Sequence, residues 1–499
     1  MKSKFPLIIY IFLIFFVEKG YTNSWPGKIP EINFQPYDKR QDNLLNIKSL
    51  HHDINLRDDK FYLISTWTIQ FDHETENVDE LIVISDRPNS KLSHVFLNKT
   101  EIIPIPIENK KNYYLLPFPE SFQKNIEIKL SLKYEFLEKS GFQLVYYTAS
   151  DLFHIAKIAK DKNNKLGYDL RKRTNMDFSE IIRTSANVNG TSRYIVFGSN
   201  GLLANPINAG LYMIGFADTA YYGMFQSSVM HTNFQIIYSK KTGLFKPDIV
   251  SEIISKSWPL FLKQFPHPTN HVVFFENPYS ILGAGPYGTN IFGVNITESI
   301  SENIQEVLAP LFNAQKFSST EEFVKNFYRE FKNPWQEYLT NLIVHELGHL
   351  FFGFGITAER HPYLHDYWFS LGMGIIYDRE INKQLTGHYP HIVEYMIDSW
   401  TNNFMERTDI DQRLVQPDLS NDQNAGINSF HRTQFIAHGK GFYVLNKIRE
   451  KIGNEIFDQE VVKYLSEGSK NLDGYISFRK QLLKHYKEIS KLEEQLKIF

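Results

Sequence analysis

The sequence predicts an α+β protein of more than one domain, in which an antiparallel β domain precedes an α/β domain that ends in helices. Its 499 residues, 42% of them hydrophobic, can bury a large core and are enough for two or three domains. Apolar and polar residues alternate with period two in the N-terminal third, which is typical of half-buried strands. Apolar residues at helical spacing replace that alternation in the second half.

The β domain is expected over residues 25–219. The alternation is clearest at residues 126–136 and returns at residues 61–71 (FYLISTWTIQF), with turn-rich joints between such runs. Short strands at residues 194–197 and 210–216 extend the pattern almost to its predicted end. We therefore expect consecutive strands joined by turns, the arrangement typical of antiparallel sheets.

The second domain is expected over residues 220–499. It begins with a strand at residues 234–239 (FQIIYS), a helix after Pro247 and a buried strand at residues 272–275 (VVFF). Asn333 and Pro334 have the composition of a helix N-cap and first turn, and apolar residues follow at helical spacing. From residue 441 onward, the pattern predicts three helices rich in lysine and glutamate.

The composition narrows the possible partners and metal ligands. Lys plus Arg (54) nearly balance Asp plus Glu (56), so the net charge of −2 gives no reason to expect nucleic acid as a partner. The sequence contains no cysteine, which excludes disulfides and thiolate ligands. A metal ion would have to be held by His, Asp or Glu side chains.

The N-terminus has the pattern of an export signal. Lys2 and Lys4 precede an uncharged apolar run at residues 5–17 (FPLIIYIFLIFFV). We expect residues 1–24 to be a cleaved signal peptide and the mature protein to be periplasmic or extracellular. An uncleaved membrane anchor is the alternative, because no A-x-A cleavage site follows the run.

The segment HELGH carries the clearest chemistry in the chain. His345 and His349 are four residues apart, so on a helix their imidazoles project from one face and can bind one zinc ion. Glu346 lies beside them, placed to accept a proton from a water molecule at the metal. The sequence therefore predicts a zinc site with Glu346 as general base.

Three segments together resemble the zinc aminopeptidases of the aminopeptidase N type, within the gluzincin group of metallopeptidases. HELGHLFFGFG resembles the family's zinc-binding helix, HExxHxWFGN, and YWFSLGMGIIYDREI resembles its LWLNEG helix. AHGKGFYVLNKIREKIGNEIF resembles the family's YxKG segment and the helix after it. The resemblance implies a saddle-shaped β domain, a thermolysin-like catalytic domain, a zinc cofactor, and hydrolysis of a peptide or protein substrate.

The chain departs from the family at three functional positions. Leu371 stands where the family has the glutamate that is the third zinc ligand. Pro286 or Tyr287 stands where a glutamate binds the free amine of a peptide. His438 matches the tyrosine that stabilises the transition state, and it could donate a hydrogen bond to an oxyanion or be a structural residue.

These departures leave the third ligand and the activity open. The candidate replacement ligands are Asp378, Glu359, His361, His365 and Asp366. The chain is expected to be an exported zinc metallopeptidase of aminopeptidase-like activity. The alternatives are a catalytically impaired pseudopeptidase that binds peptides or a protein partner, and an epoxide or ester hydrolase on the same scaffold. A membrane is expected as a partner only if the N-terminal segment stays uncleaved.

Overall fold

A computed structural model gives the architecture of the chain. It describes residues 46–57, 60–70, 80–85, 90–97, 100–102, 105–106, 113–116, 125–135, 141–148, 153–160, 166–171, 183–190, 193–198, 211–241, 243–277, 283–288, 290–296, 317–353, 357–358, 367–405, 414, 432–467 and 474–496. The predicted signal peptide, residues 1–24, lies outside these ranges. The chain divides into two compact units, and the boundary falls between Tyr222 and Gly223.

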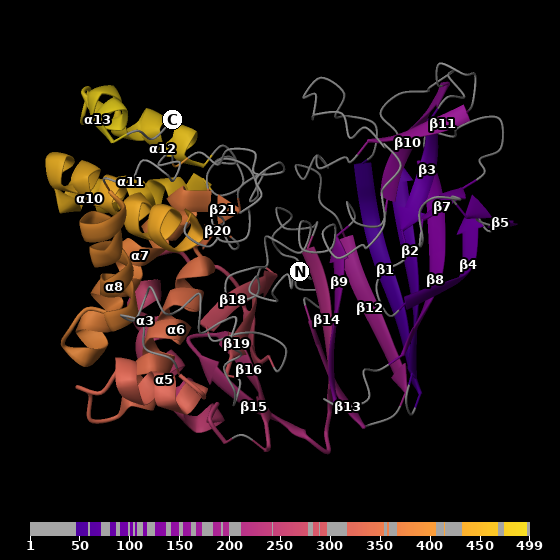
Figure 1. Ribbon diagram of the computed structural model, residues 1–499, viewed down its shortest axis with the longest axis horizontal. Coiled ribbons are helices and arrows are strands. Elements are labelled where there is room, and N and C mark those ends of the chain that lie inside the picture. Colours follow the sequence, from indigo (N-terminus) through magenta and orange to yellow (C-terminus); the bar gives the residue numbers. More distant parts are fainter. Residues whose placement is uncertain are drawn as a thin grey trace, which may run out of the picture. The chain divides into compact units, whose positions relative to one another are not determined.

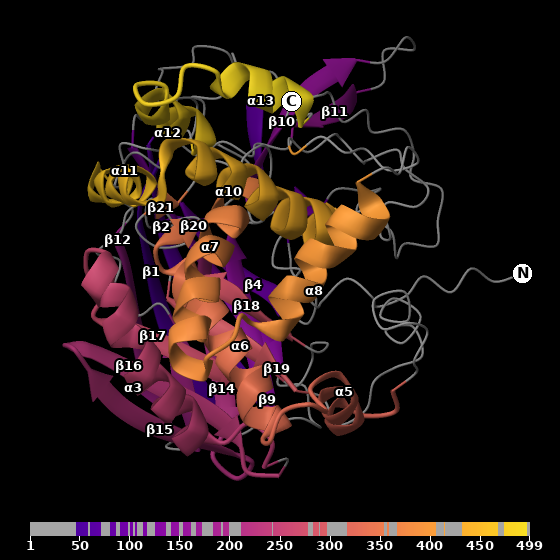
Figure 2. The ribbon, with the colours of Figure 1, turned by 90° about the vertical axis from the view of Figure 1, so that its left-hand side faces the viewer.

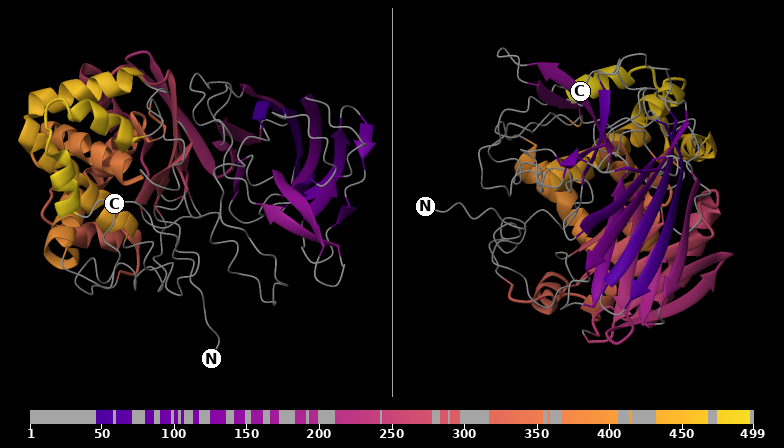
Figure 3. Two further views of the ribbon diagram at one scale, coloured as in Figure 1. Left: turned by 90° about the horizontal axis from the view of Figure 1, so that it is seen from above. Right: turned by 90° about the vertical axis from the view of Figure 1, so that its right-hand side faces the viewer.

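Every described element of the N-terminal unit up to residue 218 is a strand, shown in indigo to magenta in Figure 3. These strands are β1 (Asn46–Arg57), β2 (Lys60–Gln70), β3 (Glu80–Ser85), β4 (Ser90–Leu97), β5 (Thr100–Ile102), β6 (Ile105–Pro106), β7 (Tyr113–Leu116), β8 (Asn125–Glu135), β9 (Phe142–Thr148), β10 (Phe153–Lys160), β11 (Leu166–Arg171), β12 (Arg183–Gly190), β13 (Tyr194–Gly198) and β14 (Leu211–Asp218). They form three sheets, in the orders β12-β1-β2-β8-β4-β5, β11-β10-β3-β7-β6 and β13-β14-β9.

The strands predicted from alternation are present in this unit. The run at residues 126–136 corresponds to β8, and the run at residues 61–71 corresponds to β2, which pairs with β8 in antiparallel fashion. The expectation of a purely antiparallel domain is wrong at one edge, because β1 pairs with β12 in parallel. Period-two alternation places side chains on faces but does not fix strand direction, and strands far apart in the sequence can pair in either sense.

The C-terminal unit contains a mixed sheet of five strands. In spatial order these are β15 (Tyr222–Val229), β16 (Thr232–Ser239), β17 (His271–Glu276), β19 (Ile291–Asn295) and β18 (Gly283–Gly288). The pairs β16–β17 and β17–β19 are parallel, and β18 runs antiparallel to β19 at the edge. The predicted strands at residues 234–239 and 272–275 are therefore confirmed, and the structure adds that they are neighbours in one sheet.

Figures 1 and 2 show the helices of this unit gathered beside its sheet. They are α3 (Pro247–Gln264), α5 (Thr320–Phe327), α6 (Pro334–His349), α7 (Tyr367–Thr386), α8 (His391–Ser399), η4 (Trp400–Phe404), η5 (Arg432–Lys440), α10 (Gly441–Ile452), α11 (Asn454–Glu467), α12 (Tyr475–Leu482) and α13 (Ile489–Gln495). Two short strands, β20 (Phe352–Gly353) and β21 (Thr357–Ala358), follow α6 and pair with each other.

The expectation of three helices after residue 441 is wrong, because the structure has four described helices there, α10 to α13. The last break covers the residues LKHYKE, between Leu482 at the end of α12 and Ile489 at the start of α13. That stretch contains neither glycine nor proline, so no helix-breaking residue marks it.

Helix α3 packs against both the sheet and the segment that follows α6. Trp258 of α3 packs edge-on against Phe234 of β16, with ring centroids 5.7 Å apart. Phe261, one turn farther along α3, stacks on Phe351 at 5.4 Å. All four rings are buried in one core. The residues just after the HELGH motif are thus held in place by aromatic packing.

Helices α6 and α7 approach each other through glycine. A Cβ atom at Gly348 would lie 4.0 Å from the Cα of Gly374 on α7, which is ordinary van der Waals contact. The described part of the chain is a mixed α+β structure. None of its helices combines the length and the apolar character needed to cross a membrane.

Candidate metal centre

Helix α6 carries the HELGH motif and begins where the sequence predicts. The side chain of Asn333 accepts a hydrogen bond from the backbone N–H of Gln336 at 3.3 Å, and Pro334 occupies the first turn. From Tyr338 to His349 the helix is buried on every side. The motif therefore sits in the interior of the unit, where its polar side chains need specific partners.

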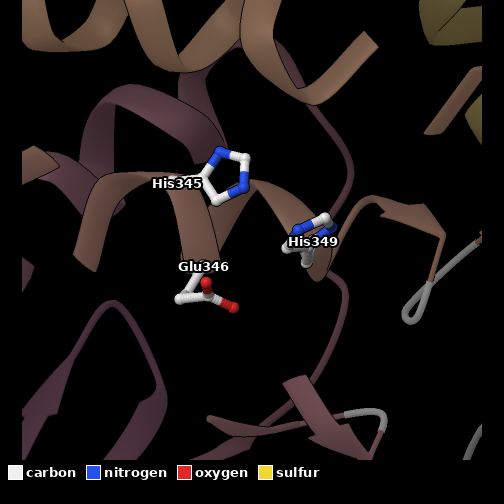
Figure 4. A group of neighbouring side chains, drawn as sticks. All are labelled: His345, Glu346 and His349. Atoms are coloured by element: carbon white, nitrogen blue, oxygen red, sulfur yellow. The ribbon is translucent and has the colours of Figure 1, made fainter. Parts of the chain in front are cut away.

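The two histidines and the glutamate of the motif converge. The rings of His345 and His349 have centroids 4.8 Å apart and meet almost at right angles. The candidate ligand atoms of His345, Glu346 and His349 all lie within 4.8 Å of one another, and all three residues are buried. Figure 4 shows the three side chains directed toward a common space beside the helix.

In both histidines, Nδ1 is engaged by an oxygen of the protein. The carboxylate of Asp378 accepts a hydrogen bond from Nδ1 of His345 at 2.7 Å. The backbone carbonyl of Phe352 accepts one from Nδ1 of His349 at 3.3 Å, and a carbonyl oxygen can only accept. In a neutral ring with the proton on Nδ1, the lone pair is on Nε2, so each imidazole offers Nε2 to a metal.

Asp378 lies behind His345 and outside the converging group. It is fully buried on α7, and the described residues that converge as possible ligands are His345, Glu346 and His349 alone. The hypothesis that Asp378 replaces the third ligand is therefore not supported by its position, since its carboxylate contacts Nδ1 of His345. Carboxylates in this position orient a metal-binding imidazole and raise its basicity.

A sequence signal for this role of Asp378 existed. The residue is the first charged residue after an apolar helical run, directly after Ile375, Ile376 and Tyr377. A buried acid in such a run needs a hydrogen-bond donor or a cation close by. What the sequence could not show is that the donor is the first histidine of the motif, 33 residues earlier.

Burial and mutual charge set the protonation of the group. Burial raises the pKa of Glu346 to about 8, with His345 opposing this rise and Asp378 adding to it. Burial, together with repulsion from His345 and His438, holds the pKa of His349 well below its ordinary value. Burial also acts to lower the pKa of His345, but the hydrogen bond and negative charge of Asp378 and the charge of Glu346 outweigh it, so the net shift is upward.

One carboxylate oxygen of the group is left for an exogenous partner. Oε2 of Glu346 is buried and has no hydrogen-bond partner among the described residues. An unsatisfied buried carboxylate oxygen is costly unless a water molecule or an ion completes its surroundings. The donor set, two Nε2 lone pairs and one unsatisfied carboxylate oxygen, fits a zinc ion with a water molecule beside it.

His438 reaches the same region from another part of the chain. It lies on the π-helix η5, is buried, and its ring centroid is 5.7 Å from that of His345. The sequence placed His438 in the site only through the resemblance, and the structure shows that the ring does lie beside the motif. Its proposed role as an oxyanion donor stays a prediction.

The remaining predicted positions divide into two classes. Leu371 is buried in the apolar core, and Pro286 and Tyr287 belong to the edge strand β18. The other candidate ligands lie outside the described residues; they are Glu359, His361, His365 and Asp366.

Comparison with protein-family models finds no match, and comparison with curated protein sequences finds no significant similarity. The function of the chain is therefore inferred from the geometry of His345, Glu346 and His349 and from the resemblance of the motifs.

Proposed function

We propose that the chain is a zinc-dependent hydrolase of the aminopeptidase N type, exported from the cytoplasm and acting on peptides. One observation carries the zinc site. Both histidines of HELGH have Nδ1 engaged by a protein oxygen, which leaves Nε2 of each ring as the metal-binding atom, and the candidate ligand atoms of both lie within 4.8 Å of that of Glu346. Two independent acceptors on two different segments would be a coincidence in a purely structural pair of histidines.

Zinc bound there would polarise a carbonyl group and lower the pKa of a water molecule to about 7. Glu346 then acts as the general base, because it adjoins both histidines and has an oxygen without a hydrogen-bond partner in the described structure. A pKa of about 8 keeps much of its carboxyl protonated at neutral pH without the metal. The charge of a bound cation lowers that pKa and gives the carboxylate that the reaction needs.

The substrate class follows from the resemblance. The three segments that resemble the family occur in the family's order along the chain, from HELGH through the helix α7 to η5 and α10. This supports a thermolysin-like catalytic domain, preceded by a saddle-shaped β domain, and a peptide bond as the scissile bond. Pro286 or Tyr287 at the amine-binding position supports a specificity other than that of a simple aminopeptidase.

A second function has one specific observation in its favour. Leu371, at the family's third-ligand position, is 1% exposed and packed in the core, so no carboxylate comes from that position. A zinc ion held by two histidines alone is bound weakly, and the domain could then bind peptides without hydrolysing them. This is the pseudopeptidase alternative.

A single substitution with a matched control separates the two functions. Glu346→Gln removes the base while keeping size and burial, whereas Glu337→Gln makes the same change on α6 at a half-buried residue that pairs with His388. The zinc-loaded proteins are incubated with a mixed peptide library, and new termini are identified by mass spectrometry.

We expect the wild type and Glu337→Gln to cleave the same bonds, and Glu346→Gln to lose at least about 100-fold in rate while it retains zinc. Cleavage unaffected by Glu346→Gln would contradict the proposal. Stoichiometric zinc and peptide binding without any cleavage by the wild type would establish the pseudopeptidase instead.

A further inference from the structure

We infer that His438 is the third protein ligand of the metal, which makes the centre a site of three histidines, His345, His349 and His438. The inference rests on the metal site of the proposed function and assigns the ligand that Leu371 does not supply. It moves the third ligand from helix α7 to the π-helix η5.

The ring spacing agrees with a shared ion. With zinc–nitrogen distances of about 2.0–2.1 Å and tetrahedral geometry, two imidazoles on one ion have ring centroids about 5 Å apart. The ring centroid of His345 is 4.8 Å from that of His349 and 5.7 Å from that of His438, so both neighbouring imidazoles lie at nearly that spacing from His345. His438 is not among the residues whose ligand atoms lie within 4.8 Å of one another, so its imidazole must move closer to the other two to bind the same ion.

Close backbone contacts fix the segment that carries His438. A Cβ atom at Gly439 would lie 2.8 Å from the Cβ of Trp400 and 2.9 Å from the backbone oxygen of Met396. A Cβ at Gly441 would lie 2.7 Å from the backbone oxygen of Trp368 on α7. Gly439 and Gly441 thus let the chain just after His438 approach α8, η4 and α7 more closely than any residue with a Cβ permits.

The same contact sets the position of His438 relative to α7. Gly441 is met from the other side by Gly372, where a Cβ would lie 2.7 Å from the backbone carbon of Gly441. Gly372 directly follows Leu371 in the sequence. The backbone next to Leu371, the residue at the family's third-ligand position, is therefore in direct contact with the chain just after His438.

The η5 segment has the character of a functional element. It is a nine-residue π-helix, Arg432–Lys440. π-Helical turns are rare in proteins overall, and those that occur are often found at functional sites. His438 is 1% exposed, so its imidazole lies in the interior of the unit, as those of His345 and His349 do.

Three neutral ligands change the chemistry of the ion. With two imidazoles and a carboxylate, one of the two positive charges of zinc is neutralised, whereas three imidazoles leave both. Zinc on three histidines is a strong Lewis acid with an open fourth position. We therefore expect a site that polarises its substrate strongly despite the loss of the glutamate.

Zinc affinity and ligand counting test the inference. Zinc dissociation constants are measured by chelator competition for the wild type, His438→Gln, His438→Tyr and His388→Gln, the last a partly exposed histidine of the same unit paired with Glu337. X-ray absorption of the zinc-loaded wild type counts the bound imidazoles without any substitution.

We expect three imidazoles per zinc ion, and at least about 100-fold weaker zinc binding in both His438 variants, with His388→Gln unchanged. Tyrosine at position 438 can still donate a hydrogen bond to an oxyanion, so a loss of zinc in His438→Tyr separates the ligand role from the oxyanion role. Unfolding of the metal-free variants by circular dichroism checks that they fold.

Two imidazoles in the wild type, or zinc affinity within threefold of the wild type in folded His438→Gln, would overturn the inference. The metal site itself would then stand, provided that substitution of His345 removes zinc, and the third ligand would be sought among residues 359–366. A wild type that binds no zinc at all would overturn both the inference and the proposed function.

Discussion

Helices α6 and α7 approach each other at Gly348 and Gly374, yet they differ in which residues of the expected zinc site they carry. Helix α6 has all three functional residues of its motif, buried and converging. Helix α7 has Leu371 in place of a ligand but retains Asp378, seven residues later, as the acceptor for His345. An acceptor that orients an imidazole has a clear purpose only if that imidazole still binds something, so the retained Asp378 supports a working metal site.

The largest effect is expected when both histidines of α6 are removed. We expect His345→Ala combined with His349→Ala to abolish stoichiometric zinc binding, because both Nε2 atoms that face the common space are lost. Elemental analysis after dialysis, with the wild type loaded in parallel, measures the effect. Equal zinc in the wild type and the double variant would place the metal elsewhere in the chain.

A smaller effect is expected on α7. Asp378→Asn keeps the size of the side chain but removes the negative charge behind His345, and we expect zinc affinity to fall by about 10- to 100-fold. The matched control is Asp458→Asn, because Asp458 also accepts a hydrogen bond from α7, from the hydroxyl of Tyr377 at 3.0 Å.

Chelator competition compares the two variants with the wild type. Asp458→Asn should bind zinc as the wild type does. If Asp378→Asn binds zinc normally, the contact with His345 is structural and the argument from α7 fails. Complete loss of zinc would instead mean that Asp378 is itself a ligand.

The contrast between α6 and α7 also marks what the sequence could predict. The motif on α6 depends on residues four apart on one helix, and a local spacing of this kind is visible in the sequence. The N-cap at Asn333 and the strands β2 and β8 were predictable for the same reason, since caps and alternation are local patterns.

Contacts between distant segments were not predictable. Asp378 and His438 approach His345 from 33 and 93 residues away, distances set by the packing of helices and not by periodicity. The parallel pairing of β1 with β12 is another such contact, joining residues over 130 positions apart. For His438 the resemblance supplied the expectation, and for Asp378 the sequence offered only its position at the end of an apolar run.

The smallest expected effect concerns the stability of the metal-free protein as a function of pH. Glu346 has a pKa of about 8 in the folded protein against an ordinary value of 4.5, and burial is the main cause. Below pH 4.5 the carboxyl is protonated in both the folded and the unfolded state, and its contribution to stability is fully present. Between these two pKa values only the unfolded state releases the proton, so the free energy of unfolding falls as pH rises, by at most about 1.4 kcal/mol per pH unit.

Glu346→Gln cannot ionise at this position. We therefore expect the free energy of unfolding of the wild type to fall relative to that of the variant from pH 5 to pH 8. His345 and His349 titrate in both proteins, so only the part of their contribution that depends on the charge of Glu346 remains in that difference. Urea unfolding of metal-free protein, followed by circular dichroism at each pH, measures it. A difference independent of pH would show that the carboxyl of Glu346 is already ionised without metal. Saturating zinc should reduce the pH dependence of the unfolding free energy of the wild type, because a cation beside Glu346 lowers the pKa of its carboxyl. The size of that reduction reports how closely the ion binds to α6.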